Sequence, residues 1–187
     1  GLRAIPNLTL IRPADANETA AAWRIAIEHR DGPVAMVFTR QKLPILDTVL
    51  YPQIHLGVRS GGYILADVPG GDDPQIILIA TGSEVHLAMQ ARERLLEDGV
   101  KTRVVSLPCW HLFQAQPQEY RDEVLPPEVP MLAIEAGVSL GWRPYVGPHI
   151  EVIGVDKFGE SAPGSRVMQE YGFNVENVVN RALKLLD

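Results

Sequence analysis

The sequence predicts an α/β protein: a three-layer domain with a doubly wound, mostly parallel sheet, preceded by a partial β-α-β unit. Apolar runs that are too short for helices alternate with amphipathic segments along most of the chain. Several of these runs lack the polar alternation of a half-exposed strand, which is typical of strands covered on both faces. The 187 residues are enough to bury a substantial core.

The first 40 residues predict the partial β-α-β unit. Residues 8–11 form a short apolar run, and Asp15 with Glu18 three residues later forms an acidic variant of a capping box, which predicts a helix start. The helix should extend to Arg30 and end at residues 31–33, where glycine and proline oppose its continuation. The residues expected on its buried side are Trp23, Ala26 and Ile27.

The apolar run at residues 34–39 predicts a second strand, parallel to the first and joined to it by a right-handed crossover. Prolines and weak periodicity in residues 41–60 then indicate a linker between domains. We therefore place a domain boundary near Gly57, which divides the chain into residues 1–57 and 58–187. The first part is the partial unit with its linker, and the second is the complete α/β domain.

The second part contains one strongly predicted helix. Thr81-Gly82-Ser83-Glu84 has the pattern of a full capping box, and Gly99 occupies the place of a left-handed C-terminal cap. The apolar stripe between them is Val85, Ala88, Met89, Leu95 and Leu96. The other predicted elements are strands at 62–68, 76–80, 102–107, 131–134 and 151–155, and helices at 118–124 and 175–186. These patterns leave the strand order open and allow an antiparallel edge strand.

Composition excludes several functional classes. The formal net charge of -6 and the scattered Lys and Arg residues argue against nucleic-acid partners. No apolar stretch approaches the roughly 18 residues that span a bilayer, and no signal-peptide pattern is present, so we expect a cytoplasmic protein without membrane contact. The single Cys109 cannot form an internal disulfide, and no Cys or His pair has the close spacing of a metal site.

Arg40 is the strongest candidate binding residue in the sequence. It follows the predicted strand 34–39 at its carboxyl end, where ligands of open α/β sheets bind. The planar donor fork of arginine matches a phosphate or a carboxylate, which predicts an anionic substrate group at this position. An ion pair between domains is the alternative interpretation.

The segment from Thr81 to Glu84 joins a strand to a helix N-terminus, where free amides and the helix dipole can bind an anion. Glu84 argues against this use, because a carboxylate in the first turn already complements the dipole. Neither a multi-glycine dinucleotide fingerprint nor a phosphate-loop lysine is present. Helix capping is therefore the favoured interpretation.

Three further positions carry polar or nucleophilic groups. Cys109, Trp110 and His111 are adjacent, but residues one or two apart seldom face each other, and no third group would orient a base, so a buried structural cysteine is expected. Glu135 and Asp156 each follow a predicted strand and could bind a ligand. We expect instead that they cap helices or accept hydrogen bonds from loop amides.

Eight segments, in order, resemble one family along essentially the whole chain. They are IRPADANETAAAW, GPVAMVFTRQ, ILIATGSEV, RVVSLPCWHLF, YRDEVLPPEV, IEAG, FGESAPG and EYGFNVENVV. These segments look like the end of the pyrimidine-binding domain and the C-terminal domain of transketolase. The opening GLRAIPNLTLIRP reaches a strand almost at once, as expected for a piece cut from a longer protein.

The resemblance implies a function for the parent protein and a role for Arg40. Transketolases of the pentose phosphate pathway use thiamine diphosphate and a divalent metal (Mg²⁺ or Ca²⁺) to transfer a two-carbon ketol unit from a ketose phosphate to an aldose phosphate. The arginine of the family's S/T-R-Q pattern corresponds to Arg40, which is expected to bind the phosphate of the sugar. The resemblance implies no catalytic, cofactor-binding or metal-binding residue in this chain, because those segments lie upstream.

We therefore expect the parent to be a homodimer, and the isolated chain to be inactive and to bind neither cofactor. Two departures from the family concern local packing: Cys109 stands where serine is common, and Pro148 and His149 lie where a glycine is often found. The nearest alternatives are the pyruvate dehydrogenase β subunit and deoxyxylulose-phosphate synthase. A different class of function is a stand-alone module that dimerises or senses an anion through the loop at Thr81.

Overall fold

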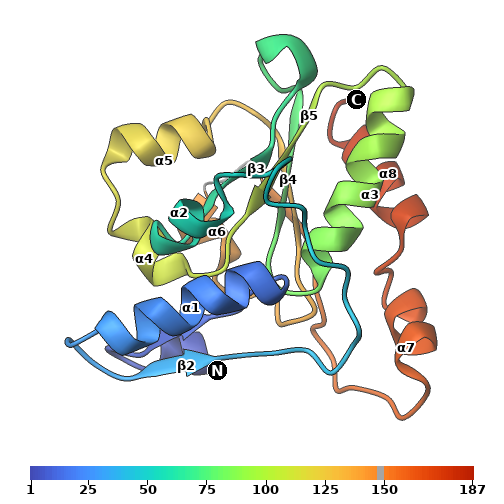
Figure 1. Cartoon of the computed structure of the whole chain (residues 1–187). Helices are drawn as coiled ribbons and strands as arrows, with labels where there is room; N and C mark the ends of the chain where they lie inside the picture. Colours follow the sequence, from blue (N-terminus) through green and yellow to red (C-terminus); the bar gives the residue numbers. More distant parts are fainter. Residues whose placement is uncertain (147–149) are drawn as a thin grey trace.

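A computed structural model describes residues 1–146 and 150–187, which form two sheets flanked by helices (Figure 1). The larger sheet has five strands in the order β3-β5-β4-β6-β7. Among these described strands only β3, at one edge, is antiparallel to its neighbour. The strands are β3 (Tyr63–Ala66), β4 (Ile76–Ala80), β5 (Thr102–Ser106), β6 (Met131–Ile134) and β7 (Ile150–Ile153). The predicted three-layer domain with a mostly parallel sheet is confirmed.

Helices cover both faces of the larger sheet, as Figure 1 shows. Successive side chains of a strand point to opposite faces, so Leu78 and Ile79 of β4 belong to different apolar clusters. The cluster around Leu78 includes residues of α3 (Glu84–Glu97) and α8 (Val175–Lys184). The opposite cluster includes residues of α4 (Trp110–Gln114), α5 (Gln118–Val124) and α6 (Trp142–Val146). The remaining elements after β2 are α2 (Ile54–Arg59), η2 (Pro69–Gly71) and α7 (Gly164–Glu170).

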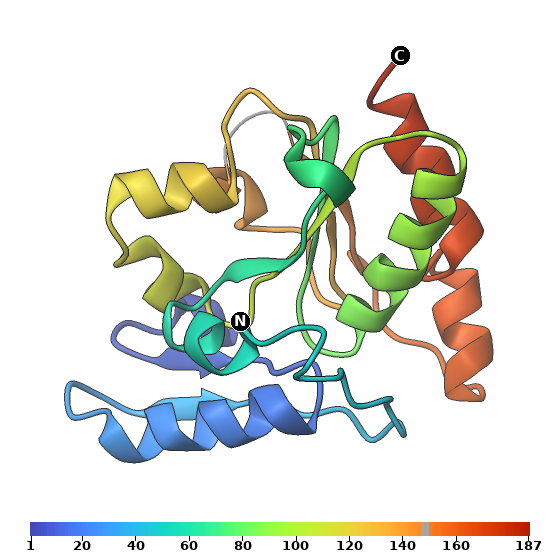
Figure 2. The ribbon, with the colours of Figure 1, turned by 45° about the horizontal axis from the view of Figure 1, so that its top comes forward.

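The N-terminal residues form a layer against the carboxyl edge of the larger sheet. After η1 (Leu2–Ala4), β1 (Thr9–Ile11) and β2 (Val34–Met36) pair in parallel on either side of α1 (Ala16–Glu28) in the chain, which confirms the β-α-β unit. Figures 1 and 2 both show α1 and β2 beneath the larger sheet. We call residues 1–45 the N-terminal layer.

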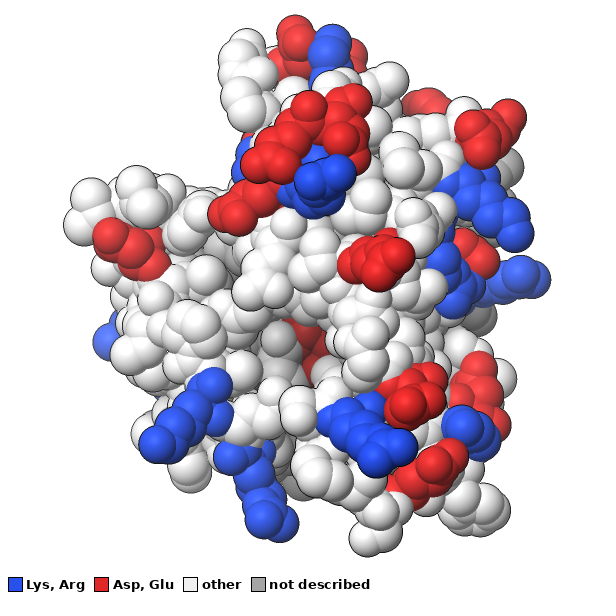
Figure 3. Space-filling model, turned by 90° about the vertical axis from the view of Figure 1, so that its right-hand side faces the viewer, with Lys and Arg blue, Asp and Glu red and all other residues white. Residues whose placement is uncertain are grey.

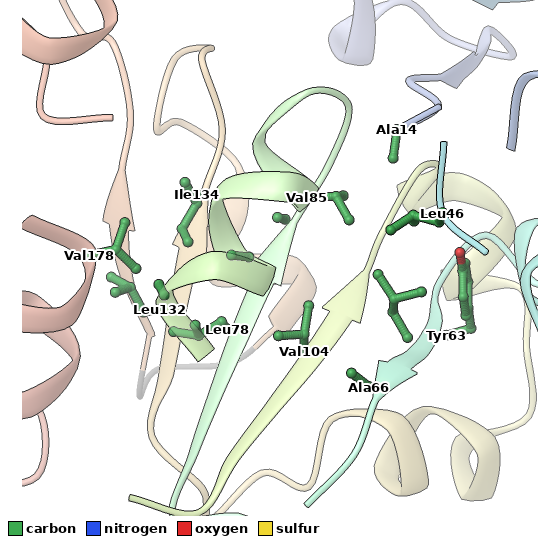
Figure 4. Packing of buried hydrophobic residues seen from close by; sticks show 14 of the residues in the cluster. Ala14, Leu46, Tyr63, Ala66, Leu78, Val85, Val104, Leu132, Ile134 and Val178 are labelled. Atoms are coloured by element: carbon green, nitrogen blue, oxygen red, sulfur yellow. The ribbon is translucent and has the colours of Figure 1, made fainter. Parts of the chain in front are cut away.

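One apolar core joins the N-terminal layer to the larger sheet. Ala14 and Leu46 belong to the same buried cluster as Tyr63 of β3 and Val178 of α8. Figure 4 shows this cluster running from α8 across the sheet to Ala14 and Leu46. The boundary near Gly57 stays a prediction, and the structure adds that Gly57 lies within α2, a helix that the sequence did not predict.

The buried face of α1 differs from the prediction. Trp23 is 52% exposed and Ile27 is 66% exposed, and Ala26 is half-buried. The buried apolar residues of α1 are Ala21, Ala22 and Ile25. The residues at positions 18, 21, 22 and 25 form the stripe that packs toward the core, because α1 approaches its neighbours closely through alanines. The predicted face, Trp23, Ala26 and Ile27, was therefore wrong, because the buried stripe lies on a neighbouring side of the helix. The second strand is also shorter than predicted, since β2 ends at Met36 and is only half-buried.

The two predicted capping boxes have different outcomes. Asp15 does cap α1, because its Oδ1 atom accepts a hydrogen bond from the Glu18 amide at 2.9 Å. The capping box predicted at residues 81–84 is wrong: no side chain caps α3, since the Thr81 hydroxyl donates to the Arg12 carbonyl and Glu84 Oε2 accepts from Arg12. Gly99 has φ +81°, as a left-handed C-terminal cap requires.

Most longer elements were predicted within one or two residues of their observed ends, and the short helix α5 was predicted with its observed ends. Helices α2, α4, α6 and α7, of five to seven residues each, were not predicted, because so short a segment gives little periodic signal. The stripe of α3 is confirmed at Val85, Ala88 and Leu95, whereas Met89 and Leu96 are only partly buried. The departure at Pro148 and His149 lies outside the described residues.

Substitution of Gly57 by alanine should destabilise the chain, because a Cβ atom there would lie 2.1 Å from Cγ of the buried Tyr63. We expect Gly57→Ala to lower the free energy of unfolding by about 1 to 3 kcal/mol, measured by urea denaturation. Gly164→Ala is the matched control, since a Cβ atom at this helical glycine meets nothing within 4 Å. Equal stability of the two variants would contradict close packing of α2 on β3.

Candidate functional site

Arg40 lies on the segment that leaves β2 at the carboxyl edge of the N-terminal layer. The last ladder contact is the hydrogen bond from the Val37 amide to the Ile11 carbonyl at 2.9 Å. The Thr39 hydroxyl then accepts a hydrogen bond from the Gln41 amide at 3.1 Å, which forms a tight turn around Arg40. Arg40 is exposed, and among the described residues its guanidinium has no hydrogen-bond or ion-pair partner.

A hollow of about 360 Å³ lies beside Arg40, between the N-terminal layer and the start of α3. We call it the Arg40 hollow. Its lining residues come from the ends of β1 and β2 on one side and from the loops after β4 and β6 on the other. They are Arg12, Pro13, Val37, Phe38, Thr39, Arg40, Gln41, Gly82, Ser83, Glu84 and Ala136.

Arg12 is the second arginine of the Arg40 hollow, and it is ion-paired. Its Nη1 atom donates to Glu84 Oε2 at 2.5 Å and to the Thr81 carbonyl at 2.9 Å. The Arg12 side chain is 15% exposed and the Glu84 side chain is fully buried. The charge of Arg12 is therefore compensated where it enters the hollow, whereas the charge of Arg40 is not.

Glu135 extends this ion pair into a cluster of four charged residues. It accepts two hydrogen bonds of 2.6 Å from Arg3, and its Oε1 atom lies 3.8 Å from Arg12 Nη1. Trp142 Nε1 also donates to Glu135 at 3.1 Å. We call Arg3, Arg12, Glu84 and Glu135 the carboxyl-edge cluster, and its formal charges sum to zero. Glu135 was expected to cap a helix or accept from loop amides, but the partners that the structure shows are the side chains of Arg3, Arg12 and Trp142.

The carboxyl-edge cluster occupies the crevice between β4 and β6. In the sheet, β5 lies on one side of β4 and β6, which follows β5 in the chain, lies on the other side. The crevice between β4 and β6 is therefore the topological switch point, where doubly wound domains bind ligands. Here Arg12 lies against Gly82, where a Cβ atom would come within 2.8 Å of Arg12 Cζ. The Gly82 backbone also has φ +62°, so glycine is required for both reasons. The loop predicted as an anion-site alternative thus contacts an arginine of the same chain.

A second polar site, which the sequence did not reveal, surrounds Glu18. This carboxyl group is fully buried. It accepts hydrogen bonds from the Ala14 amide at 2.7 Å, from the Ser106 hydroxyl at 2.6 Å and from the Tyr63 hydroxyl at 2.8 Å. Burial raises the pKa of Glu18 above 4.5, although these three donors oppose the shift. Its burial and the neighbouring Glu18 also raise the pKa of Tyr63.

The remaining candidates have structural roles, as predicted. Cys109 is 1% exposed, and burial raises the pKa of its thiol, so it has neither the access nor the thiolate of a nucleophile. The Nδ1 atom of His111 lies 3.5 Å from the hydroxyl of Thr9. Asp156 accepts hydrogen bonds from the amide and hydroxyl of Ser139, and these lower its pKa.

Comparison with protein-family models gives two matches along the chain. Residues 61–174 match the transketolase-like C-terminal domain, and residues 1–45 match the transketolase pyrimidine-binding domain. The chain belongs to the transketolase family. The two matches leave residues 46–60, which contain α2, between them.

Individual transketolases are similar over the whole chain. The transketolase of Geobacillus stearothermophilus is 53% identical over 186 residues, and that of Bacillus subtilis is 48% identical over 187 residues. Among solved structures, transketolase from Leishmania mexicana has a TM-score of 0.89 at 41% identity and covers 99% of this chain. The chain spans 28% of the length of the two bacterial relatives and 26% of the Leishmania chain.

The face of the chain seen in Figure 3 has no charge pattern typical of a polyanion-binding surface. Acidic and basic side chains are interspersed over the face that carries α3, α7 and α8. Among the described residues, no helix combines the length and apolarity needed to cross a bilayer. No group of three or more His, Cys, Asp or Glu residues in the described part of the chain could hold a metal ion.

The pH dependence of stability should reveal the buried carboxyl group of Glu18. Because its pKa is raised, the folded chain binds the proton more tightly than the unfolded chain, and this stabilisation is complete below pH 4.5. It is lost as the pH rises through the folded pKa. Relative to Glu18→Gln, the wild-type free energy of unfolding should fall with pH, by at most about 1.4 kcal/mol per pH unit.

Urea denaturation of both proteins between about pH 4 and pH 8 measures this difference. Glu176→Gln is the matched control, because Glu176 also lies in the first turn of a helix but is exposed. The difference in the free energy of unfolding between Glu176→Gln and the wild type should not fall with pH in this way. A flat difference for Glu18→Gln would mean that folding does not shift the pKa of Glu18.

Proposed function

We propose that this chain is the C-terminal part of a transketolase whose full-length parent transfers a two-carbon ketol unit from a ketose phosphate to an aldose phosphate. Arg40 binds the phosphate group of both sugars in turn. The observation that supports this role is the free guanidinium of Arg40 on the wall of the Arg40 hollow, next to an arginine whose charge is already compensated. Structures of transketolase from Pichia stipitis have been solved in complex with xylulose 5-phosphate and with sedoheptulose 7-phosphate.

The position of Arg40 suits a group that orients the substrate without reacting with it. The turn at Thr39 fixes the backbone on both sides of Arg40, while the side chain is free to meet an incoming ligand. A phosphate at the end of the sugar remote from the reacting carbon accepts charge-assisted hydrogen bonds from the guanidinium. Binding there sets the distance between the phosphate and the reacting carbon, and this positioning lowers the entropic part of the barrier.

Thiamine diphosphate and a divalent metal, Mg²⁺ or Ca²⁺, supply the two-carbon carrier chemistry of the parent in this proposal. The described residues of this chain do not fit the divalent metal. The carboxylate that lines the Arg40 hollow, Glu84, is committed to Arg12, and the described residues contain no cluster of metal ligands. We therefore place the cofactors in other segments of the parent and expect none on the isolated chain.

The organisation of the parent is also a proposal. Residues 1–57 complete the pyrimidine-binding domain and the linker, and residues 58–187 form the C-terminal domain. A homodimer in the cytoplasm is the expected state of the parent. The split-gene transketolase described as an inactive β4 tetramer has a TM-score of 0.76 at 25% identity, and this chain covers 60% of it. Its inactivity supports the proposal that the present chain is inactive alone.

The alternative of a stand-alone dimerisation or anion-sensing module is not favoured by the geometry. Its candidate site was the loop from Thr81 to Glu84. The Thr81 carbonyl accepts a hydrogen bond from Arg12, and the Thr81 hydroxyl donates to the Arg12 carbonyl. The Ser83 hydroxyl donates to Glu84. These contacts use the polar side chains of the loop within the chain itself.

Replacement of Arg40 in the full-length parent tests the phosphate role. Arg40→Ala should lower kcat/KM for phosphorylated sugars by roughly ten- to a hundredfold, because it removes charge-assisted contacts. Non-phosphorylated sugars should lose far less. Arg166→Ala, on the exposed side of α7, serves as the control and should leave both substrate classes unaffected. Equal losses for both classes in Arg40→Ala would show a structural role.

The isolated chain should not catalyse the reaction. Purified chain mixed with thiamine diphosphate, Mg²⁺, xylulose 5-phosphate and ribose 5-phosphate should form no sedoheptulose 7-phosphate above the background without protein. Chromatography with mass detection measures the product, and the full-length parent provides the positive control. Turnover by the pure chain would refute the proposal that the catalytic segments lie elsewhere in the parent.

A further inference from the structure

The Arg40 hollow contains two arginines in different electrostatic states. Arg12 and Arg40 follow the carboxyl ends of β1 and β2, which are neighbouring parallel strands, and both side chains line the hollow. Arg12 is paired with Glu84, a residue of α3, and belongs to the neutral carboxyl-edge cluster. Among the described residues that line the hollow, Arg40 is thus the one cation without a counter-charge.

Glu84 neutralises the charge of Arg12 but leaves part of the Arg12 side chain exposed to the hollow. Both hydrogen bonds that the structure shows from the Arg12 guanidinium leave from Nη1, and the side chain lines the hollow while remaining 15% exposed. Glu84 itself is held in place by the Ala136 amide at 3.0 Å and the Ser83 hydroxyl at 2.6 Å. Glu84 therefore controls the charge of a surface that an anion can still reach.

We propose that Glu84 is a specificity-determining residue for the anion bound at Arg40. By compensating Arg12, it leaves a single uncompensated guanidinium and so matches the hollow to one phosphate monoester rather than to a more highly charged anion such as a diphosphate. This inference rests on the proposed role of Arg40 and extends it to a residue of the C-terminal domain. Glu84 acts through Arg12 and does not itself touch the phosphate.

The variant Glu84→Gln removes the charge of Glu84 but keeps the shape of its side chain. The amide oxygen of glutamine can replace Oε2 and accept from both Arg12 and Ala136, while its NH₂ group can donate to the Ser83 hydroxyl in place of Oε1. The hydrogen bonds of the fold are thereby retained. Removal of the Glu84 charge raises the formal charge of the carboxyl-edge cluster from zero to +1, with Glu135 Oε1 still 3.8 Å from Arg12 Nη1. The hollow then carries positive charge at Arg12 as well as at Arg40.

The experiment titrates the 187-residue chain with inorganic phosphate and, separately, with pyrophosphate at constant ionic strength. The Nε–H signals of the individual arginines are followed by two-dimensional NMR. In the wild type, the Arg40 signal should shift with phosphate and the Arg12 signal should not, a result that needs no variant. In Glu84→Gln, pyrophosphate should bind roughly five- to tenfold more tightly, and phosphate should gain less.

Two double variants test whether the tighter binding of pyrophosphate by Glu84→Gln depends on Arg12. Glu84→Gln combined with Arg40→Ala should still bind pyrophosphate, while Arg12→Met combined with Glu84→Gln should lose the gain. Glu28→Gln is the matched control, because it removes the same charge from an ion pair with Arg59 that is exposed and outside the hollow. It should bind both anions as the wild type does.

The outcomes separate this inference from the role of Arg40. An unchanged ratio of phosphate to pyrophosphate affinity in Glu84→Gln, or an equal gain in Glu28→Gln, overturns the inference. A shift of the wild-type Arg12 signal as large as that of Arg40 also overturns it. If Arg40→Ala alone binds both anions as the wild type does, the proposed role of Arg40 fails instead, while the gain in Glu84→Gln remains a test of Glu84.

Discussion

The arrangement of the chain depends on how Arg12 connects the N-terminal layer to the larger sheet. Its amide donates to the Pro108 carbonyl after β5, and its carbonyl accepts from the Gly82 amide and the Thr81 hydroxyl after β4. Its guanidinium then pairs with Glu84 at the start of α3. One residue thereby satisfies polar groups at the ends of two central strands, which would otherwise be buried without partners. Because β1 and β2 are paired, the same contacts determine where Arg40 lies.

The Arg12–Glu84 pair specifies this arrangement more than it stabilises it. Removing two charges from water costs several kcal/mol per ion, roughly what their attraction returns, so the net contribution of a buried pair is small. Loss of one partner is a different matter and costs about 3 to 5 kcal/mol, because a charge is left buried. Stability comes from the shared apolar core, in which Ala14 and Leu46 contact the cluster of β3, β4 and β5. Packing holds the layer in place, and the polar contacts select its register.

The sequence predicted features that depend on local pattern and missed those that depend on distant partners. The strands at 76–80 and 131–134 were predicted with their observed ends, because each is an apolar run bounded by turn or polar residues. Thr81 and Glu84 were assigned a capping box from their local spacing, but the Thr81 hydroxyl donates to the Arg12 carbonyl and the Glu84 carboxylate pairs with Arg12, 72 positions earlier. Glu18 was recognised as a helix-start residue, yet no local signal connects it to Tyr63 or Ser106. Arg12 could have been found, since it follows β1 as Arg40 follows β2.

The crevice between β4 and β6 is where the C-terminal domain contributes to the Arg40 hollow. In doubly wound domains this crevice is the usual place for a ligand, and its loops are shaped by glycine for close approach. Here Gly82 provides that approach, but the group that lies against it is the guanidinium of Arg12. The domain thus binds a neighbouring part of its own chain with the features that related folds use for a cofactor. Since Arg12 and Arg40 line one hollow, this contact within the chain determines the charge next to Arg40, a residue that precedes the C-terminal domain.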